Sequence, residues 1–467
     1  MDIFFIKAGQ LILSLCILVA LHEGGHFFFA RLFKIRVEKF YLFFNPYFHL
    51  FSTKDKWFTR LFPKFKEKET EYGLGWLPLG GYVKISGMID ESMDKEQMQQ
   101  PVKPWEFRAK PAWQRLLVMI GGVLVNFVLA LVLYASILFT WGKDSLPIDR
   151  MDMGFAYNQT AKEIGFRNGD VPVSADDILF TDWNYGEVVR SISEASSVTV
   201  LREGKSVQLT MPEGLDMLQM LKESPAFLAP IVPAVVDSVL SGAPASEAGM
   251  LSGSRILAVD GTTVTTWNQI DSIISRKNDC LVMGCSAEDS VRIRTVSMVV
   301  VAPNKTTTDT LSVFLTADCR MGVLNSSLLD YYELQHKDYG FLESIPAGVR
   351  YGINTLSDYV SDLKYLFSAE GAKSVGSFGT IGNLFPATWD WQSFWSITAF
   401  LSIMLAFMNI LPIPALDGGH VFFLLVEMII RRQPSDKFME RAQTVGMILL
   451  FGLMLLAFYN DIVRFFF

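Results

Sequence analysis

The stretch that decides the fold is LVALHEGGHFFFARLF, residues 18–33. It belongs to an apolar segment that runs from Phe4 to Phe33 and is interrupted by the string HEGGH, residues 22–26. An apolar segment of this length is typical of a helix that spans a membrane. Ionisable side chains are costly inside such a helix and usually have a function there. The stretch therefore predicts a membrane-spanning helix that carries a polar site.

The HEGGH string places metal ligands on one face of that helix. His22 and His26 are four residues apart, so both imidazoles can reach one Zn²⁺ ion. Glu23 would lie beside the remaining coordination position, where a carboxylate can take a proton from a metal-bound water. We therefore expect His22 and His26 to bind zinc and Glu23 to be the general base. The alternative is a polar helix end whose histidines are satisfied by their neighbours.

A catalytic zinc ion usually has three protein ligands, so a third must come from elsewhere in the chain. Asp417 is the best candidate, within NILPIPALDGGH, residues 409–420. Pro412 and Pro414 break an apolar helix there. Irregular backbone at membrane depth is tolerated only inside protein or beside a water-filled cavity, so this carboxylate should face a polar site. The rival ligands are His420 and, less favoured because they lie in soluble segments, His49 and His336.

Asn409 lies in the same interrupted segment as Asp417. Its amide could position a substrate or support the oxyanion of a tetrahedral intermediate. It could equally make a hydrogen bond between helices of the bundle. The sequence alone favours neither role.

The composition indicates a membrane protein with soluble modules. The chain has 467 residues, half of them hydrophobic, and a formal net charge of −7, which argues against a nucleic-acid partner. Residues 31–112 contain 15 Lys/Arg and 10 Asp/Glu, a net of +5, whereas residues 142–389 contain 19 and 30, a net of −11. Basic residues near span ends favour the cytoplasmic side. We therefore expect 31–112 inside, and 142–389 and both termini outside.

The order of apolar and polar segments predicts a polytopic α-helical membrane protein with about four spans. We expect spanning helices at 1–35, 113–141, 392–420 and 441–467. A cytoplasmic loop at 36–112 contains the Gly-rich residues 72–85, whose pattern favours a membrane-associated β-hairpin. Residues 161–177 and 245–261 share one pattern, which predicts duplicated β-rich modules at 150–225 and 230–318. Apolar residues at helical spacing predict an amphipathic helix region at 340–372.

The four cysteines have no C-x-x-C spacing, which argues against a thiolate zinc site. Cys16 lies in an apolar span and is expected to be a buried free thiol. Cys280 could form a disulfide with Cys319 or with Cys285, and the sequence does not distinguish the two pairings.

The order of the motifs resembles that of the site-2 protease family of intramembrane zinc metalloproteases. HExxH in the first span and N-x-x-P-x-P-x-L-D-G near the end carry the resemblance, together with Gly-Tyr-Val-Lys at 81–84 and Asn126-Phe127. It extends over nearly the whole chain. It implies a zinc metalloendopeptidase of the bacterial inner membrane, with its active site towards the cytoplasm. Zinc would be held by His22, His26 and Asp417, with Glu23 as base.

The same resemblance implies how substrates are handled. The edge strand formed by Gly80, Gly81, Tyr82, Val83, Lys84 and Ile85 would hold an unfolded substrate segment. The two β-rich modules are similar to PDZ domains, the first one degraded. They would act outside as a size filter and could bind peptides or C-termini. Substrates would be single-span membrane proteins cut in regulated intramembrane proteolysis, such as anti-sigma factors, or leftover signal peptides.

Two other functions fit some of these residues. A membrane scaffold would use the PDZ-like pair to recruit partners and keep only a structural zinc site, but the complete base and open coordination position argue against it. A metal transporter would use the same His and Asp ligands. Four spans without a second set of intramembrane charges argue against that function.

Overall fold

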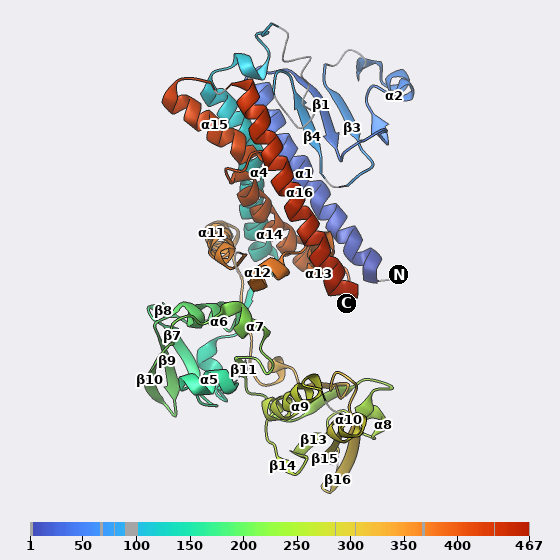
Figure 1. The fold of residues 1–467 in the computed structure, drawn as a ribbon, viewed down its shortest axis with the longest axis vertical. Helices are drawn as coiled ribbons and strands as arrows, with labels where there is room; N and C mark the ends of the chain where they lie inside the picture. The colour runs from blue at the N-terminus through green and yellow to red at the C-terminus, as the bar shows by residue number, and fades with distance from the viewer. Residues whose placement is uncertain are drawn as a thin grey trace. The chain divides into compact units, whose positions relative to one another are not determined.

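The structure is a computed structural model that describes residues 3–65, 69–78, 80–88, 101–284, 286–303, 305–366, 369–433 and 435–466. The contacts divide the chain into two compact units (Figure 1). Unit 1 comprises Met1–Gly142 and Asp338–Phe467, and unit 2 is Lys143–Lys337.

Unit 1 is a helical bundle. Among the residues that the structure describes, four helices are long and apolar enough to cross a membrane, as the sequence predicts. They are α1 (Ile3–Leu32), α4 (Ala112–Trp141), α14 (Trp391–Ile410) and α16 (Asp436–Phe466). The shorter helices of the unit are α2 (Lys56–Leu61), α12 (Ala369–Ser374), α13 (Phe378–Leu384) and α15 (Asp417–Ile430), and the longer α11 (Phe341–Leu366) packs against α4.

Glycines allow α1 and α4 to approach each other closely. A Cβ on Gly25 of α1 would lie 2.3 Å from the carbonyl oxygen of Gly121 on α4. A Cβ on Gly121 would in turn lie 2.8 Å from the oxygen of Gly25. Small residues at helix interfaces in membranes permit such backbone contact, and dispersion forces rather than burial from water then hold the helices together. The position of α4 beside the HEGGH string therefore depends on these two residues.

The helix predicted at 340–372 is present as α11, and it also packs through glycine. A Cβ on Gly348 would lie 2.4 Å from the main-chain nitrogen of Ala135 on α4, and one on Gly352 would lie 2.6 Å from Leu131. The helix is amphipathic, with Phe341 and Leu342 exposed near its start. The helix α4 therefore packs against α11 as well as against α1 and α14.

A four-stranded sheet follows α1 in unit 1. Its strands β1 (Val37–Leu42), β2 (Phe51–Ser52), β3 (Glu71–Leu74) and β4 (Tyr82–Ile85) lie in the order β2-β3-β1-β4. The predicted hairpin of residues 72–85 is therefore wrong, because β1 lies between β3 and β4. The connecting segment crosses the end of β1, where Leu77 bridges to Phe44. This arrangement leaves β4 at an edge of the sheet.

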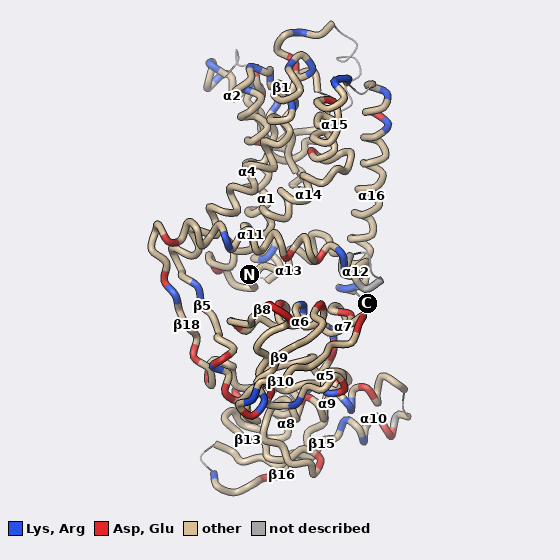
Figure 2. The backbone as a smooth tube through the Cα atoms, turned by 90° about the vertical axis from the view of Figure 1, so that its left-hand side faces the viewer, with Lys and Arg blue, Asp and Glu red and all other residues tan. Residues whose placement is uncertain are grey.

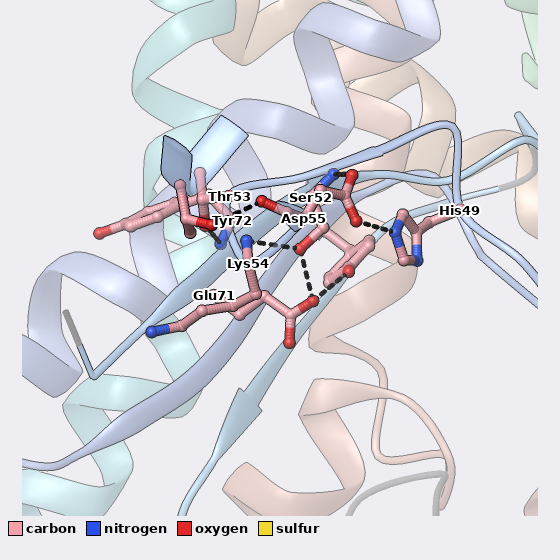
Figure 3. Close-up of polar contacts among 9 residues, drawn as sticks. His49, Ser52, Thr53, Lys54, Asp55, Glu71 and Tyr72 are labelled. Carbon is pink, nitrogen blue, oxygen red and sulfur yellow. Dashed lines mark hydrogen bonds and ion pairs between the residues drawn. The ribbon is translucent and has the colours of Figure 1, made fainter. Parts of the chain in front are cut away.

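A network of polar contacts joins the strands β2, β3 and β1 of this sheet (Figure 3). The Ser52 and Tyr41 hydroxyls each donate to Glu71 Oε1 at 2.6 Å, and the main-chain N–H of Tyr72 donates to Thr53 Oγ1 at 2.9 Å. His49 Nε2 lies 2.8 Å from Asp55 Oδ1. Burial would raise the pKa of Glu71, but the hydrogen bonds from Ser52 and Tyr41 outweigh it and hold the pKa below its ordinary value.

Unit 2 contains the same structure twice. In the first copy the sheet order is β10-β9-β7-β8. In the second copy, read in the same direction, it is β16-β15-β13-β14. The strands β7, β8, β9 and β10 therefore correspond to β13, β14, β15 and β16. Asp176 and Asp260 follow the corresponding strands β7 and β13, and both have positive φ, at 45° and 46°. Asp176 accepts from the N–H of Ser197, and Asp260 accepts from the N–H of Ser297. The repeated sequence pattern therefore marks a repeated fold.

The elements of unit 2 in chain order are β5 (Lys143–Ser145), β6 (Phe155–Tyr157), α5 (Gln159–Ile164), β7 (Val171–Ala175), β8 (Ile178–Leu179), α6 (Tyr185–Glu194), β9 (Ser197–Arg202), β10 (Lys205–Thr210), α7 (Met217–Lys222), β11 (Leu228–Pro230), β12 (Val236–Val239), α8 (Pro244–Glu247), β13 (Arg255–Val259), β14 (Thr262–Thr263), α9 (Trp267–Val282), α10 (Ala287–Arg294), β15 (Thr295–Val301), β16 (Thr308–Phe314), β17 (Val323–Asn325) and β18 (Gln335–Lys337).

One of the two disulfides that the sequence allows is absent, because Cys280 and Cys319 are both free thiols. The alternative partner Cys285 lies outside the described residues.

We predict that Gly25→Ala destabilises the protein by about 1–3 kcal/mol, because the added methyl would overlap the main chain of Gly121. Gly24→Ala is the matched control, since a Cβ there meets nothing within 4 Å and alanine favours a helix. Thermal unfolding of both purified variants in detergent measures the difference. Equal stability of the two variants would contradict the close α1–α4 contact.

Candidate metal centre

Two histidines of α1 form the first half of the site. His22 and His26 lie one helical turn apart and are 8% and 7% exposed. Their Nε2 atoms are 3.3 Å apart. A Cβ on Gly122 of α4 would lie 2.5 Å from His26 Nε2 and 2.7 Å from His22 Cε1, so α4 packs directly on both rings. Glycine at this position leaves the space that the imidazoles occupy.

Asp417 comes from a broken helix on the other side of the bundle. The helix α14 ends at Ile410, and Asp417 is the first residue of α15. Ala415 has a φ of 80° in the turn between them. Two glycines after Asp417 allow the turn to fold tightly, since a Cβ on Gly418 would lie 2.1 Å from the Leu411 oxygen, and one on Gly419 would lie 2.6 Å from the Ile413 oxygen. The Pro-rich break thus turns the Asp417 carboxylate towards α1.

The three side chains converge on one point. Asp417 Oδ2 lies 3.2 Å from His22 Nε2 and 3.3 Å from His26 Nε2, so with the 3.3 Å between the two nitrogens the atoms form a nearly equilateral triangle. Ligand atoms about 2.0–2.1 Å from a tetrahedral zinc ion are separated by about 3.3 Å. Oδ2 of Asp417 is buried and accepts no hydrogen bond in the described part of the chain. The donor set and its spacing therefore fit Zn²⁺.

A cavity of about 910 Å³ opens beside this triangle. Glu23 lines the cavity together with His22, His26 and Asp417, and the main chain of Val83 on β4 faces its carboxylate. A carboxylate in this position can exchange a proton with a water molecule in the cavity. The site thus combines three ligand atoms, a candidate base and open space for a substrate.

The edge strand β4 forms one wall of the cavity. Gly80, Gly81 and all four residues of β4 line it. Tyr82 of β4 stacks on Tyr41 of β1 at 5.4 Å, and Tyr41 is held by Glu71. The network shown in Figure 3 therefore steadies the strand that borders the site.

The residues singled out in the sequence fall into two groups. Those brought to the cavity are His22, Glu23, His26, Asp417, Asn409, Gly80, Gly81, Tyr82, Val83, Lys84 and Ile85, and the rival His420 lines it as well. The amide of Asn409 lies 3.5 Å from His22 Nε2. His49 instead pairs with Asp55, and His336 pairs with Asp144 at 2.6 Å, so neither contributes to the triangle.

Three residues of α4 that contact the histidines were not identified from the sequence. The Val118 carbonyl oxygen lies 2.8 Å from His26 Nδ1, and the Asn126 amide lies 3.3 Å from His22 Nδ1. Gly122 lies between them and packs on both rings. Of the three, only Asn126 stands out in the sequence: it belongs to the pair Asn126-Phe127 that contributes to the family resemblance, and it lies in the segment 116–141, which has no charged residue. Neither a glycine nor a main-chain carbonyl stands out there.

The chain is similar to known peptidases over nearly its whole length. The model of peptidase family M50 matches residues 10–453. A putative zinc metalloprotease of Xylella fastidiosa (strain 9a5c) is 26% identical over 492 residues, which cover 98% of this chain and 99% of the relative. The regulator of sigma-E protease RseP of Salmonella typhimurium (strain 14028s / SGSC 2262) is 27% identical over 483 residues, 97% of each chain. A putative zinc metalloprotease of Thermotoga maritima is 26% identical, covering 97% of this chain and 98% of the relative. The chain therefore belongs to peptidase family M50.

Proposed function

We propose that this peptidase is a zinc metalloendopeptidase of the site-2 type that cuts single-span membrane proteins within their transmembrane segments. One observation carries the proposal: the triangle of His22, His26 and Asp417 has the spacing of a zinc site and borders a cavity inside a bundle of membrane-length helices. The names of relatives that match almost the whole chain support the same activity.

His22 Nε2, His26 Nε2 and Asp417 Oδ2 would hold the zinc ion. When bound, Zn²⁺ supplies a Lewis acid that polarises the scissile carbonyl and makes a water molecule easier to deprotonate. Three protein ligands leave one coordination position open, which is the usual arrangement of a catalytic zinc site. These residues are fixed by α1 and by the turn after α14, so the position of the ion is set by the packing of the bundle.

Glu23 would act as general base and then as general acid. Its carboxylate borders the cavity between the histidines of α1 and the main chain of β4. It would accept a proton from the attacking water and deliver it to the leaving amine. Asn409, whose amide lies 3.5 Å from His22 Nε2, would position the substrate carbonyl or stabilise the oxyanion.

The edge strand β4 would hold the substrate in an extended form. A helix shields its peptide bonds, because each main-chain N–H is bonded within the helix. Pairing with a free strand edge would replace those hydrogen bonds and expose one peptide bond to the site. One edge of β4 pairs with β1, and the strand borders the cavity beside Glu23, which supports this role.

The distribution of charge supports a placement of the protein in the cell. Figure 2 shows Lys and Arg gathered at the end of unit 1 that carries α2 and β1. The positive-inside rule would put this end in the cytoplasm of a bacterium and unit 2 on the outer side of the inner membrane. The repeated modules of unit 2 would then act as PDZ-like domains that exclude large ectodomains or bind peptides. Anti-sigma factors and leftover signal peptides are the substrates that this arrangement would suit.

Replacing Glu23 with Gln should lower the cleavage rate of a single-span reporter by about 10²–10⁴-fold, because the amide cannot accept the proton. Zinc content should stay at the wild-type level, since Glu23 is not one of the three ligands. Cleavage assays and metal analysis on the same purified sample measure both. Wild-type cleavage by this variant would refute the role of Glu23.

The ligand assignment is tested by comparing Asp417→Ala with His420→Ala. Both residues line the cavity, but only Asp417 belongs to the triangle. We expect Asp417→Ala to lose bound zinc and His420→Ala to retain it, as measured by metal analysis after dialysis. The opposite pattern would make His420 the third ligand.

Val83→Pro tests the edge strand. Proline removes the main-chain N–H of Val83, which borders the cavity and faces the Glu23 carboxylate. If a substrate strand takes up this N–H, one lost hydrogen bond of about 0.5–1.5 kcal/mol should raise KM and so lower kcat/KM about 2–12-fold, with kcat and zinc content retained. Val83→Ala keeps the N–H and serves as the control. A fall in kcat at unchanged KM would show that the N–H acts on Glu23 instead, and equal kcat/KM values for the two variants would show that β4 does not pair with the substrate through Val83.

A further inference from the structure

The two histidines face the triangle with the same ring nitrogen. In both His22 and His26 it is Nε2 that lies near Asp417 Oδ2. A neutral imidazole that binds a metal through Nε2 carries its proton on Nδ1. Each Nδ1–H then needs an acceptor, and that acceptor fixes the tautomer and the plane of the ring.

The acceptor for His26 is a main-chain carbonyl. His26 Nδ1 lies 2.8 Å from the oxygen of Val118, so its N–H donates to α4. The partner of His22 Nδ1 is the side-chain amide of Asn126, 3.3 Å away, also on α4. Asn126 is fully buried, and its Oδ1 has no hydrogen-bond partner among the described residues.

The amide of Asn126 has two ends, and only one of them can accept a proton. Nδ2 is the end that lies nearest His22 Nδ1, and Nδ2 is a donor. A half-turn about the Cβ–Cγ bond exchanges the two ends and brings Oδ1 to His22 Nδ1. Either orientation leaves one end of the amide unpaired, but only the exchanged one provides an acceptor for the Nδ1–H of a metal-binding His22.

We propose that Asn126 is the positioning residue for His22, whose Nδ1–H it accepts through Oδ1 so that Nε2 is held free for the metal. This inference rests on the proposed zinc site and adds a residue that supports it without touching the metal. The histidines would then be oriented in a matched way by α4, one by a main-chain carbonyl and the other by a side-chain amide.

Two packing contacts flank Asn126 on α4. Gly122 lies one turn before Asn126 on α4, and its close contact with His22 and His26 brings this face of α4 to the rings. On the other side, the Ser402 hydroxyl of α14 donates to the main-chain oxygen of Asn126 at 2.7 Å. Ser402 is fully buried as well. Because Ser402 bonds the main chain of Asn126 and not its side chain, the side-chain amide remains available to His22.

The test is zinc affinity, measured by competition with a chelator on the full-length protein in detergent. Asn126→Leu keeps the branching and the number of side-chain heavy atoms but cannot accept a hydrogen bond, and we expect its affinity to fall about 10–100-fold. Asn126→Asp retains an acceptor at the same position and should bind zinc within a few-fold of wild type. Asn126→Ser, which is smaller and cannot reach His22 Nδ1, should show the loss seen with Leu even if Leu impairs folding.

Ser402→Ala provides the matched control, because it removes a hydrogen bond between α4 and α14 without altering the side chain next to His22. We expect its zinc affinity to remain at the wild-type level. The absorption spectrum of the cobalt-substituted protein, which reports ligand geometry, should change in Asn126→Leu and not in Ser402→Ala.

Three results would overturn the inference. They are wild-type affinity in both Asn126→Leu and Asn126→Ser, equal losses in Asn126→Leu and Ser402→Ala, and a loss in Asn126→Asp as large as that in Asn126→Leu. His22→Ala separates this failure from failure of the metal site. If it abolishes zinc binding while Asn126→Leu and Asn126→Ser keep wild-type affinity, only the positioning role is wrong, whereas retained binding in His22→Ala would refute the proposed site itself.

Discussion

The structure depends on the convergence of two imidazoles and a carboxylate inside a bundle of apolar helices. Polar groups at membrane depth are costly unless other polar groups or a metal ion satisfy them. His22, His26 and Asp417 meet at 3.2–3.3 Å, and His22 also contacts Asn126 on α4 and Asn409 on α14. A bundle that separated α1 from the turn after α14 would leave these groups unpaired, so the same interactions would hold the site and the fold together.

Glycine makes this convergence sterically feasible. Gly25 and Gly121 let α1 and α4 touch through their main chains, Gly122 leaves room for the imidazoles, and Gly418 allows the tight turn that aims Asp417 at them. On α16, a Cβ at Gly446 would lie 1.7 Å from the oxygen of Pro414, so the same turn is also backed closely by the last helix. Glycines thus occur at these four close approaches of the main chain to the site.

The sequence predicts the parts of this account that depend on local patterns. Four apolar segments predict the spans, the spacing of His22 and His26 predicts a shared face, and a Pro-broken segment predicts that Asp417 faces a polar site. The pairing of β3 and β4 was predicted wrongly, because the Gly-rich pattern of residues 72–85 reveals turns but not that β1 would lie between the strands. The roles of Val118 and Gly122 could not be predicted, because a main-chain carbonyl and a small residue act only through the packing of α4 on α1.

Under the proposed function, the protein hydrolyses peptide bonds only when His22, His26 and Asp417 hold a zinc ion. The most direct measurement is cleavage of a single-span reporter by the purified protein in detergent, with a zinc chelator and then with zinc restored. Loss of cleavage on chelation and its recovery with added Zn²⁺ is the result that the account predicts. Unchanged cleavage in protein shown to be free of metal would contradict it.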